Sequence, residues 1–120
     1  MRRVAITGIG IVSCIGNNKN EVLESLLNTK SGIVFSEEQK KYNFRSHVHG
    51  PVKNLDLDQH IDRKIKRFMG LGSAYNYIAL KEAIKESGLE EKDISNEKTG
   101  IVMGSGGPSI QNVYFAVDTI

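Results

Sequence analysis

The sequence has little cysteine, no long apolar run and no large excess of charge of either sign. Its one cysteine, Cys14, excludes a disulfide framework and a cysteine metal cluster. No apolar run approaches the length of a membrane span. The 16 basic and 14 acidic residues give a net charge of +2. General nucleic-acid binding needs a larger basic excess, spread over a whole face of the protein.

The start of the chain lacks the apolar region of a signal peptide, because Met1-Arg2-Arg3 is followed by a few apolar residues and then by glycines. We therefore expect a cytoplasmic protein that does not contact a membrane. Its 120 residues make one domain or part of one. Residues 113–120 end within an apolar helical run that has no cap and no polar tail, which predicts the N-terminal portion of a longer protein.

Two short segments predict strands. Residues 4–6 form a continuous apolar run after which glycines follow, which is typical of a buried, central strand. Residues 99–103 predict a second strand. The region between residues 33 and 60 is otherwise irregular, with a candidate short strand at residues 46–49.

Helical spacing of apolar residues occurs in three places. Residues 19–28 predict an amphipathic helix, and a long helix is expected from Arg63 to Ser87, closed by Gly88 as its C-terminal cap. Another helix begins at Ile110. The order strand, helix, helix, strand predicts an α/β fold with a mostly parallel sheet.

Two glycine-rich stretches follow the predicted strands. Gly8, Gly10 and Gly16 resemble a dinucleotide-binding loop only weakly, because Ser13 stands where the third glycine belongs. A tight turn and close packing explain these glycines better. Residues 104–108, Gly-Ser-Gly-Gly-Pro, precede a helix and suit either a loop that clears space for a ligand or a plain strand-to-helix turn. Spacing alone does not decide between these two interpretations.

The cysteine and the histidines do not form a recognisable reactive group. Cys14 has no histidine or basic cluster near it in sequence, which favours a small buried hydrophobe over a nucleophile. His47 and His49 fall on one side of the candidate strand, but two histidines make a poor metal site. His60 has no metal-ligand spacing to either of them. We therefore expect no catalytic residue and no metal site here.

A cluster of cations stands out between residues 63 and 67. We call Arg63, Lys64 and Arg67 the basic patch, because in a helix these three side chains share one exposed side. Ile65 and Phe68 are expected to face inward at the same period. A compact positive surface of this kind suits an acidic partner.

The ordinary explanation of a charge run is a solvated helix face. Against it, no acidic residue is interleaved between residues 63 and 67. Lys66 adds a fourth cation to the cluster, and Asp62 is a candidate partner for it four positions earlier.

Several stretches, taken in order, resemble the start of a β-ketoacyl-acyl-carrier-protein synthase. The closest resemblance is to the bacterial type I condensing enzyme of fatty-acid synthesis, and it spans nearly all 120 residues. The stretches that carry it are residues 4–13, 15–18, 21–23, 31–33, 35–36, 45–48, 61–64, 67–69 and 104–107. An ordered series of this length is far more specific than any single glycine motif.

The resemblance implies a thiolase-like fold of αβαβα layers, made of two similar halves in a homodimer. Residues 1–120 would be the N-terminal portion of a ketosynthase N-terminal domain. The implied reaction is the decarboxylative Claisen condensation of an acyl group on a cysteine with malonyl-carrier protein, and it needs no cofactor. The family's nucleophilic cysteine and its two active-site histidines lie beyond residue 120. Cys14 holds a position that is usually serine, so it does not replace that nucleophile.

Two sets of positions match the family's binding residues. The residues that match Arg63, Lys64 and Arg67 contact the acidic helix of acyl carrier protein. The glycines that match Gly106 and Gly107 lie near the acyl pocket, where the absence of a side chain leaves room for the acyl chain.

Two residues depart from the family's pattern. Pro108 stands where relatives carry glycine, which puts the local loop shape and the chain-length preference in doubt. His49 replaces the usual tryptophan, with no clear consequence. The alternative to the enzyme is a non-catalytic module that binds acyl carrier protein through the same cations and lacks the chemistry.

Overall fold

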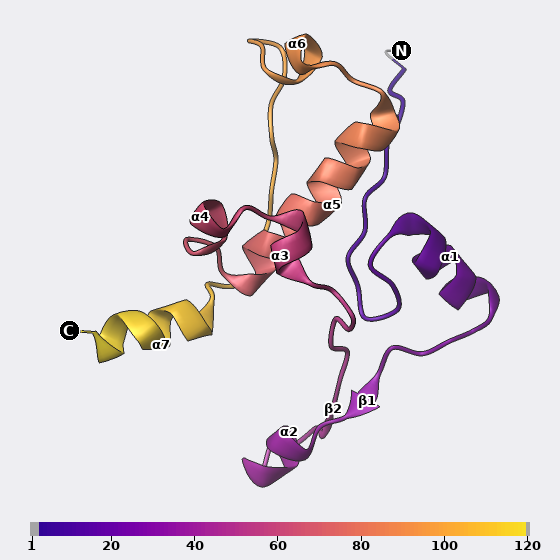
Figure 1. Cartoon of the computed structure of the whole chain (residues 1–120). Helices are drawn as coiled ribbons and strands as arrows, with labels where there is room; N and C mark the ends of the chain where they lie inside the picture. Colours follow the sequence, from indigo (N-terminus) through magenta and orange to yellow (C-terminus); the bar gives the residue numbers. More distant parts are fainter. Residues whose placement is uncertain (1–2, 120) are drawn as a thin grey trace.

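A computed structural model describes residues 3–119 of the chain. Its elements are, in chain order, α1 (Lys19–Leu27), β1 (Val34–Phe35), α2 (Glu37–Lys41), β2 (Val48–His49), α3 (Leu57–His60), α4 (Arg63–Lys66), α5 (Leu71–Ser87), α6 (Glu91–Ile94) and α7 (Ile110–Asp118). Figure 1 shows α5 in the middle of the molecule, the β1–β2 hairpin and α2 at one end, and α7 leading away to the C-terminus.

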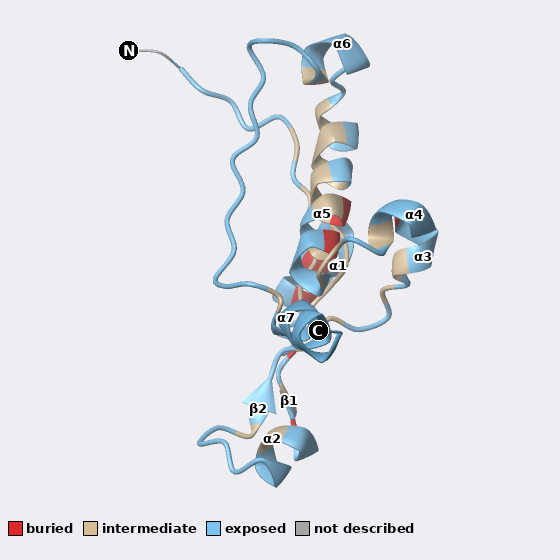
Figure 2. Cartoon of the chain, turned by 90° about the vertical axis from the view of Figure 1, so that its left-hand side faces the viewer, coloured by how far each residue is buried: buried red, intermediate tan, exposed pale blue. Residues whose placement is uncertain are grey.

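The molecule is open and its core is small. The radius of gyration is 17.5 Å, against about 14 Å for a compact domain of this length. Ile61, Ala74 and Ile78 form the buried cluster, so the core joins the residue that follows α3 to one face of α5. Figure 2 shows a few buried residues, chiefly on α1 and α5, with intermediate ribbon along much of α5 and an exposed ribbon at both ends of the molecule. The core therefore fixes the α3–α5 region more firmly than the two ends of the molecule.

The strands expected at residues 4–6 and 99–103 are wrong, because within residues 3–119 neither segment pairs with a neighbour. Val4 is 94% exposed and Val102 is 98% exposed, so neither segment is buried. A strand needs backbone hydrogen bonds to an adjacent strand, and an apolar run without one stays extended chain. The mostly parallel sheet is likewise not seen in this part of the chain.

The sheet that is present is a short antiparallel hairpin. Val34 lies opposite His49, and Phe35 lies opposite Val48. This confirms the candidate strand within residues 46–49. The region from residue 33 to residue 60 is also more ordered than predicted, since it contains β1, α2, β2 and α3.

The helix expected from Arg63 to Ser87 is wrong as a single element, because it is divided into α4 and α5. Gly70 interrupts it with an extended backbone, φ −72° and ψ 163°, and serves as the N-terminal cap of α5. Glycine has a low helix propensity, so a break at this point costs little. Gly88 ends α5 with φ +70°, which confirms the predicted C-terminal cap.

Helix α1 confirms the helix predicted at residues 19–28 but not its apolar face. Val22 is buried, whereas Leu26 is 62% exposed. The helix is held instead by polar contacts, including a 2.6 Å hydrogen bond that Ser25 Oγ donates to the Ile15 carbonyl. At its end, the Lys30 ammonium hydrogen-bonds the Glu24 carboxylate and lowers the pKa of that carboxyl below its usual value.

Helix α7 confirms the helix that was expected to begin at Ile110, and Ile120 lies outside the described residues. Ser109 caps it, accepting a 3.4 Å hydrogen bond from the Asn112 backbone N–H at its side-chain oxygen. Its apolar side chains are exposed, with Tyr114 at 64% and Val117 at 69%. The apolar surface of α7 therefore has no cover within residues 3–119.

The N-terminal segment lies directly against α5. A Cβ atom added to Gly8 or Gly10 would overlap the backbone carbonyl oxygens of Ala83 and Ala79, respectively. This confirms that these glycines permit close packing, as the sequence favoured. It also explains why no nucleotide-binding loop is needed to account for them.

Two carboxylates of α5 hold this segment in place. Glu86 Oε2 accepts a 2.7 Å hydrogen bond from the Ile9 backbone N–H, and Glu82 Oε2 accepts one of 3.0 Å from the Ile11 backbone N–H. Glu86 also forms an ion pair with Lys19 at the start of α1. The side chains of α5 thus satisfy donors that a neighbouring strand would satisfy in a sheet.

Candidate functional site

Helix α4 is a single turn whose N-terminus is set by Asp62. The Asp62 side chain accepts a 2.8 Å hydrogen bond from the Lys64 backbone N–H, which satisfies one of the free donors at the helix start. The helix follows Ile61, which is 2% exposed and belongs to the core. The buried isoleucine and the aspartate cap together fix the position of a very short cationic helix.

All three members of the basic patch are exposed. Among residues 3–119, no carboxylate lies within ion-pair distance of Arg63, Lys64 or Arg67. The structure therefore leaves the three cations accessible to solvent, and their arrangement on one side of the helix stays a prediction.

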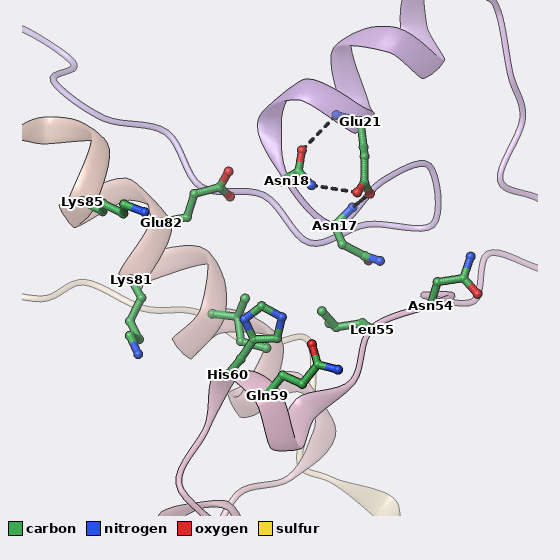
Figure 3. Close-up of a pocket in the computed structure, with 11 residues that line it drawn as sticks. Asn17, Asn18, Glu21, Asn54, Leu55, Gln59, His60, Lys81, Glu82 and Lys85 are labelled. Carbon is green, nitrogen blue, oxygen red and sulfur yellow. Dashed lines mark hydrogen bonds between the residues drawn. The ribbon is translucent and has the colours of Figure 1, made fainter.

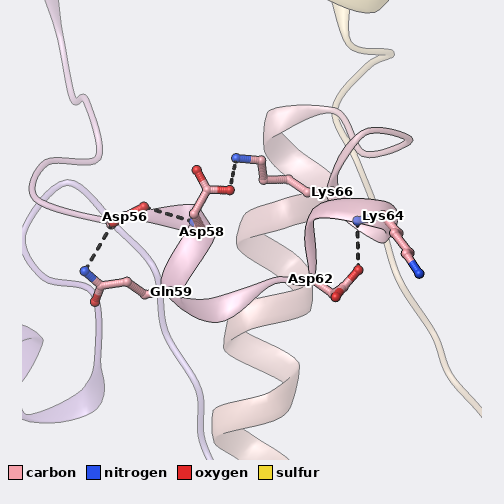
Figure 4. Close-up of polar contacts among 6 residues, drawn as sticks. All are labelled: Asp56, Asp58, Gln59, Asp62, Lys64 and Lys66. Atoms are coloured by element: carbon pink, nitrogen blue, oxygen red, sulfur yellow. Dashed lines mark hydrogen bonds and ion pairs between the residues drawn. The ribbon is translucent and has the colours of Figure 1, made fainter.

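Lys66 behaves differently from the patch. Its Nζ atom lies 2.5 Å from Asp58 Oδ1 on α3, so the predicted pairing with Asp62 is wrong. Figure 4 shows the Lys66 side chain reaching toward α3, while Lys64 points away from it and Asp62 is occupied at the helix start. Asp58 and Lys66 are eight residues apart, and helical spacing gives no signal for a pair at that distance.

The apolar side chains of α4 do not face inward as expected. Ile65 is 46% exposed and Phe68 is 75% exposed. The Arg67 guanidinium lies 4.5 Å from the centroid of the Phe68 ring, a cation–π geometry. The end of the helical turn and the break before α5 turn Phe68 outward, because the helical period stops before it.

The glycine-rich loop at residues 104–108 is exposed throughout. Ser105 Oγ donates a 2.7 Å hydrogen bond to the Gly107 carbonyl, which tightens the loop. A Cβ atom added to Gly106 or Gly107 would meet nothing within 4 Å. Within residues 3–119, the space beside these two glycines is therefore open, and packing does not require them to be glycine.

The N-terminal caps of α5 and α7, which follow α4 and the glycine-rich loop in the chain, approach each other closely. A Cβ atom on Gly70 would lie 2.7 Å from the Ser109 Cβ, and Ser109 follows Pro108 directly. Gly70 is three residues beyond Arg67. The chain segments that follow the basic patch and the glycine-rich loop thus meet at Gly70 and Ser109.

A hollow lies elsewhere, between the start of α1, helix α3 and helix α5. It measures about 510 Å³. Figure 3 shows polar side chains around it, with Asn18 and Glu21 bonded to each other at one side. Its lining residues are Asn17, Asn18, Glu21, Asn54, Leu55, Gln59, His60, Ile78, Lys81, Glu82 and Lys85. Sequence reasoning did not predict this hollow, since its walls come from three separate segments.

Cys14 and His47 pack against neighbouring residues, whereas His49 and His60 are exposed. Cys14 is half-buried beside Gly32 and Gly50, where added Cβ atoms would lie 2.7 Å and 3.0 Å from its sulfur. His47 packs edge-on against Phe35, with the two ring centroids 6.0 Å apart. No group of three potential metal ligands occurs among the described residues. In the same part of the chain, no helix has the length and apolarity needed to cross a membrane.

Comparison with known proteins shows the family to which this chain belongs. A family model, the beta-ketoacyl synthase N-terminal domain, matches residues 1–116. The chain therefore belongs to the β-ketoacyl synthase family. The basic patch and the glycine-rich loop both lie within the matched residues.

Individual relatives agree with this assignment. The chain is 51% identical over 120 residues to 3-oxoacyl-[acyl-carrier-protein] synthase 1 of Haemophilus influenzae, which covers 100% of this chain and 29% of the relative. It is 47% identical over 121 residues to the synthase 1 of Escherichia coli K12, which covers 100% of this chain and 30% of the relative. A 3-oxoacyl-[acyl-carrier-protein] synthase 2 of Vibrio cholerae is 36% identical over 105 residues. This match covers 88% of this chain and 25% of the relative. The chain thus spans about three tenths of the length of the synthase 1 relatives.

Proposed function

We propose that this chain is the N-terminal part of a 3-oxoacyl-[acyl-carrier-protein] synthase of type I. The observation that carries the proposal is the match to synthase 1 proteins along the full chain at 47% to 51% identity. The thiolase-like layers, the homodimer and the cytoplasmic location belong to the same proposal. So does the extent of the domain, of which residues 1–120 would be a portion.

The proposed reaction lengthens an acyl chain by condensation. An acyl group passes from the carrier thioester to a cysteine thiol, and the carrier leaves with a free thiol. Loss of CO₂ from malonyl-carrier protein then leaves a carbanion on the α-carbon of the carrier-bound acetyl unit. The carbanion attacks the thioester carbonyl, a carbon–carbon bond forms, and the cysteine leaves as a thiolate. Nucleophilic catalysis of this kind needs the cysteine together with its activating groups. In the proposal, residues 1–120 supply docking and pocket residues rather than that nucleophile.

The basic patch would bind acyl carrier protein. Its three cations are exposed and have no carboxylate partner within residues 3–119. A fixed positive surface steers an acidic partner toward it and orients the partner on arrival. The contact adds modest affinity that weakens as salt increases.

Gly106 and Gly107 would border the acyl pocket. The open space beside both glycines is compatible with an acyl chain that passes there. Pro108 lacks a backbone N–H and has a fixed φ, so it stiffens the loop next to these glycines. In this proposal, Pro108 makes acyl-length preference differ from that of a relative with glycine at the same position.

The proposal is tested by supplying acyl- and malonyl-carrier protein to two proteins. The 120-residue chain alone is expected to make no 3-oxoacyl product above background. The product of the whole reading frame is expected to make 3-oxoacyl-carrier protein and release CO₂. A frame that ends at codon 120 would instead support the non-catalytic carrier-binding module. Product from the short chain alone would contradict the assignment of the chemistry to residues outside it.

A further inference from the structure

We propose that Asp58 sets the strength of carrier-protein docking by withholding Lys66 from the basic patch. The inference rests on the proposed function, since it concerns the same docking surface. Four cations occur within residues 63–67, and among residues 3–119 a carboxylate pairs with one of them, Lys66. The carboxylate that neutralises Lys66 is that of Asp58, which lies on α3, whereas the four cations lie on or directly after α4.

Hydrogen bonds within α3 hold Asp58 in position for its ion pair with Lys66. The Asp58 backbone N–H donates a 3.0 Å hydrogen bond to Asp56 Oδ1, and Gln59 Nε2 donates one of 3.2 Å to Asp56 Oδ2. These contacts hold the first turn of α3 and leave the Asp58 carboxylate free for Lys66 (Figure 4). The side chain of Asp58 therefore has no role in capping its own helix.

The position of Lys66 explains why its neutralisation matters. Lys66 is three residues from Arg63, so its side chain borders the patch on the helix surface. Paired with Asp58, it turns toward α3 and is 31% exposed. Without that carboxylate, the ammonium is free to extend into solvent beside Arg63.

An acidic partner would meet two changes if Asp58 lost its charge. A repelling carboxylate at the edge of the docking surface would disappear, and a fourth cation would become available. For exposed charges each effect is small, so we expect binding to tighten about two- to fivefold at low salt. The gain should fade at physiological salt, where the screening length is about 8 Å.

The binding test uses the product of the whole reading frame and acyl carrier protein that bears its phosphopantetheine arm. Asp58→Asn should tighten binding, and Lys66→Met in the unchanged background should have little effect. The double variant should lose part of the gain that Asp58→Asn gives. Glu97→Gln removes the same charge at an exposed residue outside the docking region and should leave binding unchanged.

A second measurement follows Lys66 without any carrier protein. Amine acetylation, read residue by residue by mass spectrometry, should be slower at Lys66 than at Lys64 in the unchanged chain. In Asp58→Asn the rate at Lys66 should rise several-fold, whereas the rate at Lys64 should not change. Equal rates in the unchanged chain would overturn the pairing on which the inference depends.

The two measurements separate the possible failures. If the unchanged chain binds the carrier protein and Asp58→Asn binds no tighter, the tuning role of Asp58 is wrong and the docking proposal stands. If the unchanged chain does not bind at all, docking and tuning are both overturned. Acetylation then still reports whether Asp58 restrains Lys66.

Discussion

At the scale of single residues, exposure and pairing matter more than the number of charges. Lys64 and Lys66 are two positions apart in sequence, yet one is free and the other is paired across to α3. Lys64 contributes its backbone N–H to the helix cap, and its ammonium has no carboxylate partner within residues 3–119. The proposed docking surface is therefore defined by which cations lack a carboxylate partner within residues 3–119, and a count from the sequence overestimates it.

Reversing the charge at Lys64 should weaken carrier-protein binding. We expect Lys64→Glu to lower affinity about three- to tenfold at low salt and less at high salt, because the local field is reversed. Lys98→Glu makes the same change at an exposed lysine that follows α6. Titration of both variants with the carrier protein checks this, and equal losses would count against a local docking surface.

At the scale of elements, the helices could be predicted better than the strands. A helix satisfies its own backbone, so the spacing of residues 19–28 and the glycine at position 88 were sufficient to place α1 and the end of α5. A strand depends on a partner that is distant in sequence, and residues 4–6 and 99–103 have none within residues 3–119. The pairing of Asp58 with Lys66 escaped prediction for the same reason.

The packing of the N-terminal segment on α5 gives a stability prediction. Gly10→Ala should destabilise the chain by about 2 kcal/mol or more, because its Cβ would overlap the Ala79 carbonyl. Gly72→Ala, within α5, has open space at its Cβ and should stabilise by up to about 1 kcal/mol. Urea unfolding followed by circular dichroism measures both, and similar values for the two variants would contradict the close approach.

At the scale of the whole molecule, residues 3–119 expose an unusual amount of apolar surface. Ile6 is 86% exposed on the N-terminal segment, Ile101 is 72% exposed near the glycine-rich loop, and Val117 is 69% exposed on α7. Scattered apolar residues are normal on a surface, but three separate segments of this kind are not. Such segments expose surface on which other chains can pack.

The isolated 120-residue chain should therefore associate with itself and bind a hydrophobic dye. Dye fluorescence should be high in dilute solution, and light scattering should rise with protein concentration, since apolar burial drives association. Replacing Val102 with lysine should lower the scattering without changing the helix content. A monomeric chain with low dye fluorescence would show instead that these apolar segments are buried within the chain itself.

The contact of Gly8 and Gly10 with α5 also fixes how far the N-terminal segment can slide. Two residues of extended chain advance about 6.6 Å, and four residues of helix advance about 6.0 Å, so successive glycines meet successive turns at Ala83 and Ala79. Because the two repeats nearly match, the backbone alone would allow the segment to shift by two residues along α5. That displacement, however, would press Ile6 or Val12 into the helix instead of a glycine. The two glycines therefore fix the register of the N-terminal segment along α5 and disfavour the adjacent registers.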